Sequence, residues 1–359
     1  MSVELTNSLG SVCTHFLPQG QLKHSEPFGS GHINQTYLVT IDGQRYILQC
    51  LNTNIFPNPH ALMDNMVRVC DHLCSKGHSA PEVLRTPDGQ PFALCNQGGF
   101  WRLSPFFEGT RTVDQPQSPR QAFQVGKAFG GFARAVADLP GPRLHETLPD
   151  FHHTPKRIER LFAAVDGNPH GRVAGAGPEI DFVGERRDQA ARLLAAGLPE
   201  RITHNDTKIN NVLLDSITDE AVCVIDLDTV MPGLALFDFG DMVRTTTCLA
   251  AEDETNLSLL SVDHALFSAL TEGYLQQVHD VLTPTELELL AFSGWVITLE
   301  IGVRFLTDHL EGDTYFKIHR PDHNLERARA QFALARSLEQ QMTRLEDTVE
   351  RLRESVARR

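Results

Sequence analysis

The segment THNDTKINN, residues 203–211, restricts the fold and chemistry of the chain more than any other stretch. It contains a His-x-Asp triplet and an Asn five residues after the Asp, at His204, Asp206 and Asn211. A carboxylate at such a place accepts the proton of an attacking hydroxyl, and a nearby amide oxygen can ligate a metal ion. We therefore predict that Asp206 is a catalytic base and that Lys208 meets a transferring phosphoryl group.

A second carboxylate is predicted to lie beside this segment. Two short strands, 211–215 and 221–226, flank a turn at 216–220, which is typical of an antiparallel hairpin. Such a hairpin brings Asn211 and Asp226 together at its open end, next to Asp206. An amide oxygen and a carboxylate are ligands that Mg²⁺ accepts alongside phosphate oxygens. We predict a Mg²⁺ site at Asn211 and Asp226.

A glycine-rich turn stands near the start of the chain. Gly29, Ser30 and Gly31 lie between predicted strands at 25–28 and 36–41. Small residues let backbone amides approach phosphate oxygens, so we predict that these three bind the nucleotide. His32 follows them, and it is interpreted either as a substrate contact or as an exposed loop residue.

The order of predicted elements favours an α+β fold with two lobes. Asp42-Gly43 between two apolar runs indicates a hairpin of strands 36–41 and 44–51. Further expected strands are 82–86, 91–95 and 100–107, and expected helices are 59–76, 121–139, 155–164 and 179–196. We predict a β-rich lobe over residues 1–108 and a mostly helical lobe over 109–359. Apolar residues from 338 to 356 predict a last helix, which either docks on the second lobe or forms a dimeric coiled coil.

Composition limits the partners. The chain has 32 Lys and Arg against 46 Asp and Glu, a formal charge of −14, which disfavours nucleic acid and anionic membranes. The seven cysteines show no Cys-x-x-Cys spacing and are predicted to be reduced thiols in the cytoplasm. No signal peptide is expected at the start, and Leu287–Val303 is interpreted as a core helix because Glu288 and Glu300 interrupt it. No obligate protein partner is evident.

The longer blocks resemble the aminoglycoside phosphotransferase and choline kinase-like family, which shares the protein-kinase fold. These blocks are GSGHINQTYLV (29–39), RYILQCLNTNIFP (45–57), THNDTKINNVLLD (203–215), VIDLDTVMPGLALFDFGDMVR (224–244) and RFLTDHLEGDTYF (304–316). The resemblance implies a small-molecule kinase that uses ATP and Mg²⁺. It also implies a small sugar acceptor, an N-acetylhexosamine phosphorylated at its anomeric hydroxyl.

The resemblance implies roles for matching residues. Asp206 is the expected base, and Asn211 and Asp226 are the expected Mg²⁺ ligands. Phe106, Phe107 and Glu108 are the expected hinge that meets adenine through its backbone.

Two features need separate interpretation. Kinases of this fold carry a Lys on the third strand that pairs with a helix Glu, but Gln49 stands near that place. We expect phosphate positioning to come from another cation, such as Arg45 or Arg68.

The triplet Asp238-Phe239-Gly240 has the letters of the kinase metal motif, but it lies outside the hairpin. We therefore predict that Asp238 braces the catalytic loop.

Acceptor contacts are expected from the helical lobe. Glu300, Arg304 and Asp308 are spaced i, i+4 and i+8 on an otherwise apolar helix. They form either an internal Glu–Arg ion pair or a polar ring for substrate hydroxyls, and both can hold together. We expect His32, Thr229, Arg304 and Asp206 to supply hydrogen-bond partners to a sugar.

Two other functions remain open at this point. The chain could phosphorylate homoserine, choline or an aminoglycoside, and its net negative charge suits a cationic acceptor. It could also be a nucleotide-binding scaffold without catalysis, which the missing strand Lys favours and the retained Asp206, Asn211 and Asp226 disfavour.

Overall fold

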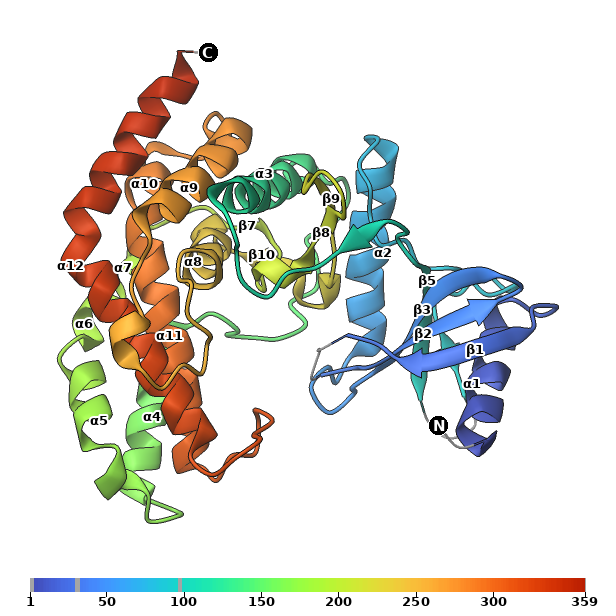
Figure 1. The fold of residues 1–359 in the computed structure, drawn as a ribbon, viewed down its shortest axis with the longest axis horizontal. Coiled ribbons are helices and arrows are strands. Elements are labelled where there is room, and N and C mark those ends of the chain that lie inside the picture. Colours follow the sequence, from blue (N-terminus) through green and yellow to red (C-terminus); the bar gives the residue numbers. More distant parts are fainter. Residues whose placement is uncertain (1–2, 30–32, 96–98, 359) are drawn as a thin grey trace. The chain divides into compact units, whose positions relative to one another are not determined.

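The computed structural model describes residues 3–29, 33–95 and 99–358 and divides the chain into two compact units (Figure 1). The first unit comprises Met1–Thr110 with two later segments, Leu139–Leu148 and Cys223–Met231. The second comprises Arg111–Asp138, Pro149–Val222 and Pro232–Arg359. The division into lobes at residue 108 stays a prediction, and the first unit also takes in segments far beyond that residue.

The first unit is built on a five-stranded antiparallel sheet of order β1-β2-β3-β5-β4. Its strands are β1 (Leu22–Pro27), β2 (Gln35–Ile41), β3 (Gln44–Leu51), β4 (Ala93–Leu94) and β5 (Phe100–Pro105). The hairpin predicted at Asp42-Gly43 is confirmed, and both residues have positive φ, 49° and 85°. That turn geometry matches the twist of the flanking strands. The sheet and the helical second unit confirm the predicted α+β fold class.

Two helices belong to the first unit. α1 (Val3–Phe16) was not expected, because the first hundred residues read as strands apart from one helix. Leu9, Val12, Cys13 and Phe16 follow helical i, i+3, i+4, i+7 spacing and pack with Val39, Leu48 and other sheet residues in one core. α2 (Pro59–Ser75) begins at the Asn58 cap and matches the prediction for 59–76.

Residues 82–86, which were predicted to form a strand, are irregular in the structure. Leu84 N–H donates to Leu103 O of β5, but Thr86 N–H turns to Gln90 O. A single ladder bond does not make a strand.

The second unit is mainly helical (Figure 1). Its helices are α3 (Pro119–Val136), α4 (Thr154–Gly167), α5 (Gly177–Gly184), α6 (Arg187–Ala190), α7 (Arg192–Ala195), α8 (Ala235–Thr246), α9 (His264–Val278), α10 (Pro284–Glu288), α11 (Leu290–Leu310) and α12 (His323–Ala357). The single helix predicted over 179–196 is wrong. It is three short helices, because tighter i→i−3 bonds at Arg186 and Ala191 end one turn and begin the next.

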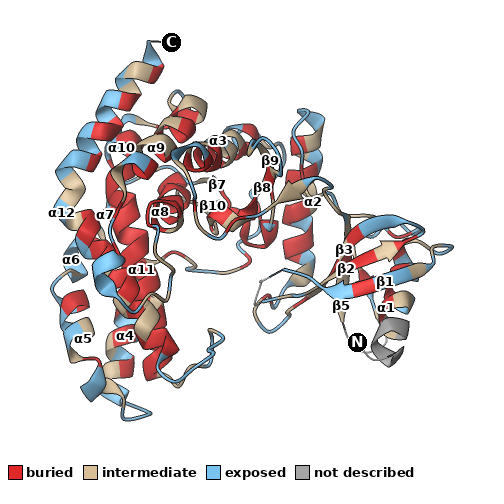
Figure 2. Cartoon of the chain, in the orientation of Figure 1, coloured by how far each residue is buried: buried red, intermediate tan, exposed pale blue. Residues whose placement is uncertain are grey.

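Glycines allow the closest helix packing in this unit. A Cβ on Gly126 of α3 would collide with the Leu270 carbonyl of α9, and one on Gly273 of α9 with the Phe123 carbonyl of α3. α11 is long and apolar enough to cross a membrane by length and composition, but almost all of it is buried inside the protein (Figure 2). This burial confirms that it is a core helix.

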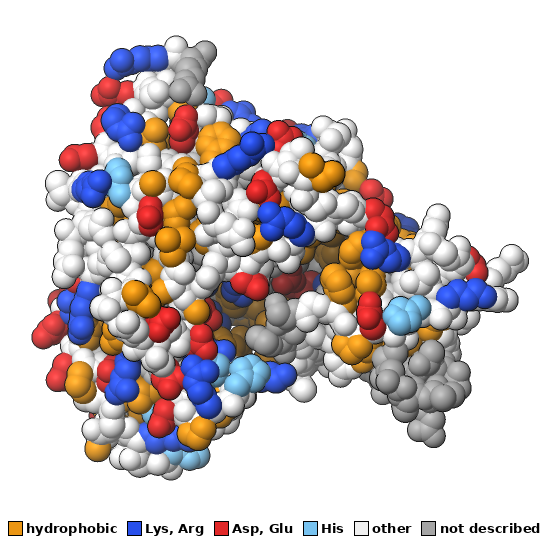
Figure 3. All heavy atoms as spheres, in the orientation of Figure 1, with side chains coloured by type: hydrophobic (Ala, Val, Ile, Leu, Met, Phe, Trp, Pro, Cys, Tyr) orange, Lys and Arg blue, Asp and Glu red, His pale blue; other side chains and the backbone are white. Residues whose placement is uncertain are grey.

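The last helix, α12, packs along α11 and α9. Its apolar residues Leu338, Leu345, Val349 and Leu352 are buried within the chain. The structure therefore favours docking over a dimeric coiled coil. Figure 3 shows acidic and basic side chains interspersed on the surface of this unit.

The remaining strands are short. They are β6 (Thr110–Arg111), β7 (Arg201–Thr203), β8 (Val212–Asp215), β9 (Ala221–Val224) and β10 (Met231–Gly233). β6, β8 and β9 form a three-stranded sheet, and β7 pairs with β10. The predicted hairpin is present, although β8 begins one residue later and β9 ends two residues earlier than predicted.

Candidate active site

The loop after β7 holds the predicted catalytic residues in a constrained backbone. His204 is fully buried and lies edge-on to the rings of Phe129 and Phe132, with centroid distances of 5.3 and 5.8 Å. Asn205 adopts the left-handed conformation with φ of 65°, which Asn and Asp tolerate better than other non-glycine residues. The packing of His204 and the left-handed backbone of Asn205 together fix the direction in which the chain continues to Asp206.

Asp238 braces this loop, as predicted. It lies in the first turn of α8, and its two carboxylate oxygens accept the backbone N–H groups of His204 (2.8 Å) and Asn205 (2.7 Å). Its own carbonyl accepts the Thr207 hydroxyl at 2.6 Å. Burial raises the pKa of Asp238 to about 6, so the carboxylate is ionised at neutral pH. The literal Asp-Phe-Gly therefore has a structural role in this chain.

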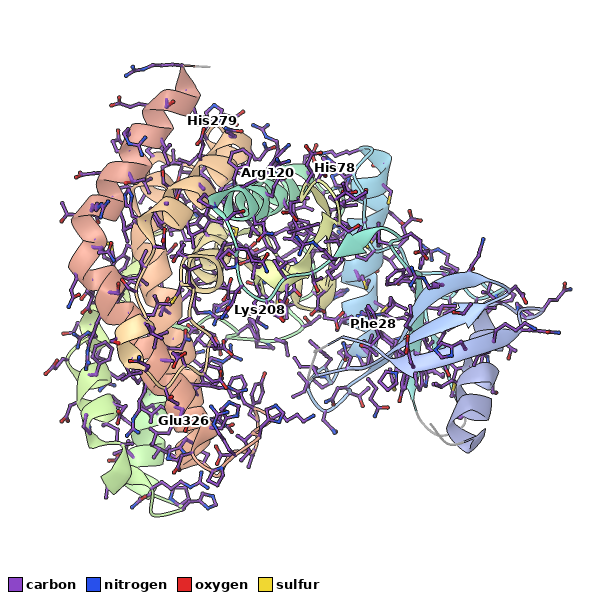
Figure 4. All side chains as sticks on the ribbon, in the orientation of Figure 1. Phe28, His78, Arg120, Lys208, His279 and Glu326 are labelled. Atoms are coloured by element: carbon purple, nitrogen blue, oxygen red, sulfur yellow. The ribbon has the colours of Figure 1, made fainter. Side chains whose placement is uncertain are left out.

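Asp206, Lys208 and Asn211 are brought together within the second unit. Lys208 Nζ lies 2.8 Å from Asp206 Oδ1, and Asn211 Nδ2 donates to Asp206 Oδ2 at 3.2 Å and to the Asp206 carbonyl at 2.8 Å. Lys208, which is labelled in Figure 4, lies two residues after Asp206 in the same loop. About a quarter of the Asp206 side chain is exposed, so a substrate can reach it.

The charge state of Asp206 suits a base. Burial alone would raise its pKa, but the charge and hydrogen bond of Lys208 outweigh burial and hold the pKa below its usual range. The carboxylate is therefore ionised at neutral pH and can accept a proton.

The predicted Mg²⁺ ligands fit such an ion by their chemistry. Because the Asn211 amide nitrogen donates to Asp206, its amide oxygen is left for a cation. Asp226 follows β9 and takes the left-handed conformation with φ of 61°, a strained geometry that is frequent at functional sites. Asn211 belongs to the second unit and Asp226 to the first, and the joint site stays a prediction.

A buried histidine that the sequence reasoning missed links α11 to the loop after β7. His152 Nδ1 lies 2.8 Å from Glu300 Oε1, and its Nε2 lies 3.0 Å from the Asn205 carbonyl. The second Glu300 oxygen accepts the Thr154 hydroxyl at 2.6 Å. Glu300 therefore pairs with His152 and not with Arg304, the partner that the spacing along the helix suggests. Nothing in the local sequence marks His152, because its partners lie far along the chain.

Glu300 is fully buried, and both its oxygens are occupied by protein groups. Burial opposes the charged forms of both partners. Their mutual attraction nevertheless raises the pKa of His152 and lowers that of Glu300, so the two form a buried ion pair. A substrate contact for Glu300 stays a prediction, and its observed contacts position α11.

Arg304 has a different environment. Its guanidinium lies 5.1 Å from the ring centroid of Phe151, 5.8 Å from that of Tyr315 and 5.6 Å from that of Phe316. Asp308, one turn later, accepts the backbone N–H groups of residues 314, 315 and 316 and so holds the segment that carries two of these rings. Among the residues that the structure describes, no carboxylate forms an ion pair with Arg304.

The glycine-rich turn is described only in part. Gly29 has a φ of 79°, a conformation that favours glycine. Ser30, Gly31 and His32 lie outside the described residues, and their predicted roles stay predictions. Thr229 is buried in the turn after Asp226, within the first unit.

The predicted hinge is tied to the sheet. Phe106 N–H donates to Arg45 O at 3.1 Å, and Arg45 pairs with the Glu108 carboxylate and lies over the Phe106 ring. The Phe107 carbonyl accepts the Thr110 hydroxyl at 2.8 Å. Adenine binding by these residues stays a prediction that rests on the remaining backbone groups of Phe107 and Glu108.

Neither expected substitute for the missing strand Lys stands beside Gln49. Arg45 is engaged by Glu108, and Arg68 donates to the carbonyls of Pro140 and Pro142. The cation beside Gln49 is Arg102 of β5, whose Nε donates to Gln49 Oε1 at 2.9 Å. The sequence contains one signal for Arg102, which is a charged residue at an inward-facing position of the strand predicted over 100–107.

An antiparallel sheet unit, a helical unit and a braced Asp–Lys–Asn loop define a phosphotransferase of the protein-kinase-like fold. Residues 24–272, more than half of the chain, match the APH phosphotransferase enzyme family. The chain therefore belongs to this family. It is an ATP-dependent kinase of a small molecule, and ATP and Mg²⁺ are its cofactors.

Solved structures of small-molecule kinases share the fold. A microcompartment-associated aminopropanol kinase is 15% identical, with a TM-score of 0.66 over 95% of this chain and 98% of that one. An amicoumacin kinase in complex with AMP-PNP and Ca²⁺ is 15% identical, with a TM-score of 0.61 over 97% and 94% of the two chains. Ethanolamine kinase from Plasmodium vivax is 12% identical, with a TM-score of 0.55 over 86% and 82%.

Proposed function

We propose that the chain is an N-acetylhexosamine 1-kinase. It transfers the γ-phosphoryl group of ATP to the anomeric hydroxyl of N-acetylglucosamine or N-acetylgalactosamine and releases the sugar 1-phosphate and ADP. The similarity of the long sequence blocks supports this acceptor. The observation that carries the choice of acceptor class is the environment of Arg304.

The Arg304 guanidinium forms no ion pair with a carboxylate of the described residues and lies among three aromatic rings, so it offers hydrogen-bond donors and apolar walls together. Sugar hydroxyls and an acetamido group need this combination. Arg157 is a second cation within electrostatic reach of Arg304: burial and the charge of Arg304 lower the pKa of Arg157, and the Glu300 carboxylate opposes that shift only in part. Two adjacent guanidinium groups repel a cationic acceptor, which argues against choline or an aminoglycoside.

The proposed chemistry follows from the loop geometry. The ionised Asp206 carboxylate accepts the proton of the anomeric hydroxyl while that oxygen forms a bond to the γ-phosphorus. The bond from the γ-phosphorus to the β-γ bridging oxygen breaks, and ADP leaves with that oxygen. Lys208 is placed to stabilise negative charge on the transferring group. A bound Mg²⁺, held by Asn211 and Asp226, would neutralise phosphate charge.

A kinase of an amino alcohol is the second candidate. The net charge of −14 suits a cationic acceptor, and the solved structures named above include kinases of aminopropanol and ethanolamine. For either acceptor we propose a cytoplasmic location, which the free thiols of all seven described cysteines support.

The test is ADP release with N-acetylhexosamines, amino alcohols and aminoglycosides, followed by analysis of the product. We expect turnover of N-acetylglucosamine or N-acetylgalactosamine and a product that is acid-labile and has no reducing end. A product that survives mild acid and still reduces would place the phosphate elsewhere on the sugar. Turnover of amines alone would overturn the proposed acceptor.

A further inference from the structure

The first unit contains a buried charged network that the proposed chemistry does not use. At its centre is Arg102 of β5, whose side chain is only 2% exposed. Its guanidinium pairs with Asp228, whose side chain is 5% exposed. A buried arginine is strongly unfavourable unless its charge and its N–H groups are compensated, so the residues around it must hold a fixed arrangement.

The position of Arg102 relates it to the missing strand lysine. Gln49, which stands near the place of that lysine on β3, is the direct cross-strand partner of Arg102. Gln49 Oε1 accepts from both Nε (2.9 Å) and Nη2 (2.8 Å) of Arg102, and Gln49 Nε2 donates to the Thr36 hydroxyl at 3.1 Å. The glutamine therefore orients a cation that comes from the neighbouring strand.

The anionic partner of Arg102 also comes from a different place. In a protein kinase the strand Lys pairs with a Glu on the following helix. Here the corresponding helix, α2, meets Arg102 with Met66, whose sulfur lies 3.3 Å from Nη1. The carboxylate comes instead from Asp228, two residues after the predicted metal ligand Asp226.

Asp228 also reaches the glycine-rich segment. Its second oxygen accepts from Asn34 Nδ2 at 2.6 Å, and Asn34 Oδ1 accepts the Asn52 backbone N–H at 3.0 Å. Asn34 lies shortly after the predicted phosphate-binding turn. One carboxylate therefore connects the exit of that turn to the cation on β5.

The turn that contains Asp228 is also held by a contact from α2. Asn65 Nδ2 donates to the Val230 carbonyl at 3.0 Å, and Asn65 is 1% exposed. The turn that follows Asp226 is therefore held at Asp228 by Arg102 and at Val230 by α2 through Asn65. The helix that usually supplies a Glu here supplies a neutral amide.

We infer that Arg102 and Asp228 form a relocated ion pair that positions both the metal ligand Asp226 and the exit of the phosphate-binding turn. This pair has the orienting role of the strand Lys–helix Glu pair in protein kinases. Arg102 does not contact phosphate directly, because it is buried and bonded to protein groups. Arg102 is thus a positioning residue. This inference rests on the proposed role of Asp226 in metal binding.

The test measures how Mg²⁺ changes the affinity of the purified protein for a non-hydrolysable ATP analogue, using titration calorimetry with and without Mg²⁺. We expect Arg102→Met to reduce the Mg²⁺-dependent gain in affinity by tenfold or more. Affinity without Mg²⁺ should change less than threefold. Arg102→Lys, which keeps a charge for Asp228, should restore at least half of the lost gain on a logarithmic scale.

Two further variants keep the test decisive. Arg186→Met removes a bidentate pair with Glu339 in the second unit, and it should lower the melting temperature without changing the Mg²⁺ effect. If Arg102→Met does not fold, Asp228→Asn, which preserves shape, replaces it and should show the same tenfold loss.

The outcomes distinguish failure of the ion-pair inference from failure of the proposed metal site at Asp226. If Asp226→Ala loses the Mg²⁺ effect but Arg102→Met and Asp228→Asn keep it, the ion pair is only structural and the inference is overturned. If Asp226→Ala itself keeps the full Mg²⁺ effect, the proposed metal site fails first, and the inference fails with it.

Discussion

The brace formed by Asp238 allows a quantitative prediction. Asp238→Ala removes the acceptors of two backbone N–H groups, those of His204 and Asn205, at 2.8 and 2.7 Å. Both residues are buried, at 0% and 3% exposure, so bulk water does not reach these two donors in the folded wild type. An unpaired buried donor costs about 1–3 kcal/mol, which predicts a loss of about 2–6 kcal/mol in the free energy of unfolding.

The assay is chemical denaturation of Asp238→Ala and Asp238→Asn beside the wild type. The asparagine keeps one acceptor oxygen and should lose roughly half as much stability as the alanine. Any turnover that Asp238→Ala retains should show a nearly normal Mg²⁺ dependence, because both Asp238 carboxylate oxygens accept backbone N–H groups of the loop. An alanine variant that denatures like the wild type but loses its Mg²⁺ response would refute the brace and make the literal Asp-Phe-Gly the metal site.

Three other predictions test the rest of the site. Asp206→Asn should lower kcat by about a hundredfold or more with little change in melting temperature, because it removes the proton acceptor; near-normal turnover would mean that Asp206 is not the base. Arg304→Ala should raise the KM for the acceptor about tenfold, equal to about 1.4 kcal/mol, and leave the KM for ATP nearly constant, and equal effects on both would assign Arg304 a structural role. Because Glu300 raises the pKa of His152 above 6.5, protonation of His152 beside the ionised Glu300 stabilises the fold below pH 6.5, and this contribution is lost as pH rises through the folded-state pKa of His152. Melting curves from pH 6 to 9 should show this decline in the wild type, and His152→Gln should flatten it; an unchanged pH slope in the variant would contradict the pair.

The sequence alone determined the features that depend on neighbours along the chain. The Asp42-Gly43 hairpin needs only two residues that tolerate positive φ between two apolar runs, and it is present as predicted. The loop from His204 to Asn211 is also local. Its hydrogen bonds from Asn211 and Lys208 to Asp206 span five residues or fewer, so their spacing already indicated that these side chains meet.

Some local signals pointed elsewhere. The apolar residues of α1 have helical spacing in the sequence, but the strand signals that follow them dominate the first hundred residues. The helical pattern over 179–196 is correct within each of the three short helices, but it does not predict the tighter turns at Arg186 and Ala191 that separate them. Periodicity reports which face of a segment is apolar, and it does not report where backbone hydrogen bonds are interrupted.

Only the tertiary structure decided which distant groups are partners. Arg102 and Asp228 lie 126 residues apart, and His152 and Glu300 lie 148 residues apart. No local pattern marks either pair, because a buried charge is stabilised by whichever partner the fold brings within hydrogen-bond distance. The sequence showed that a lysine was missing from the third strand. The packing of β5 against β3 decided that an arginine from the next strand stands beside the glutamine in its place.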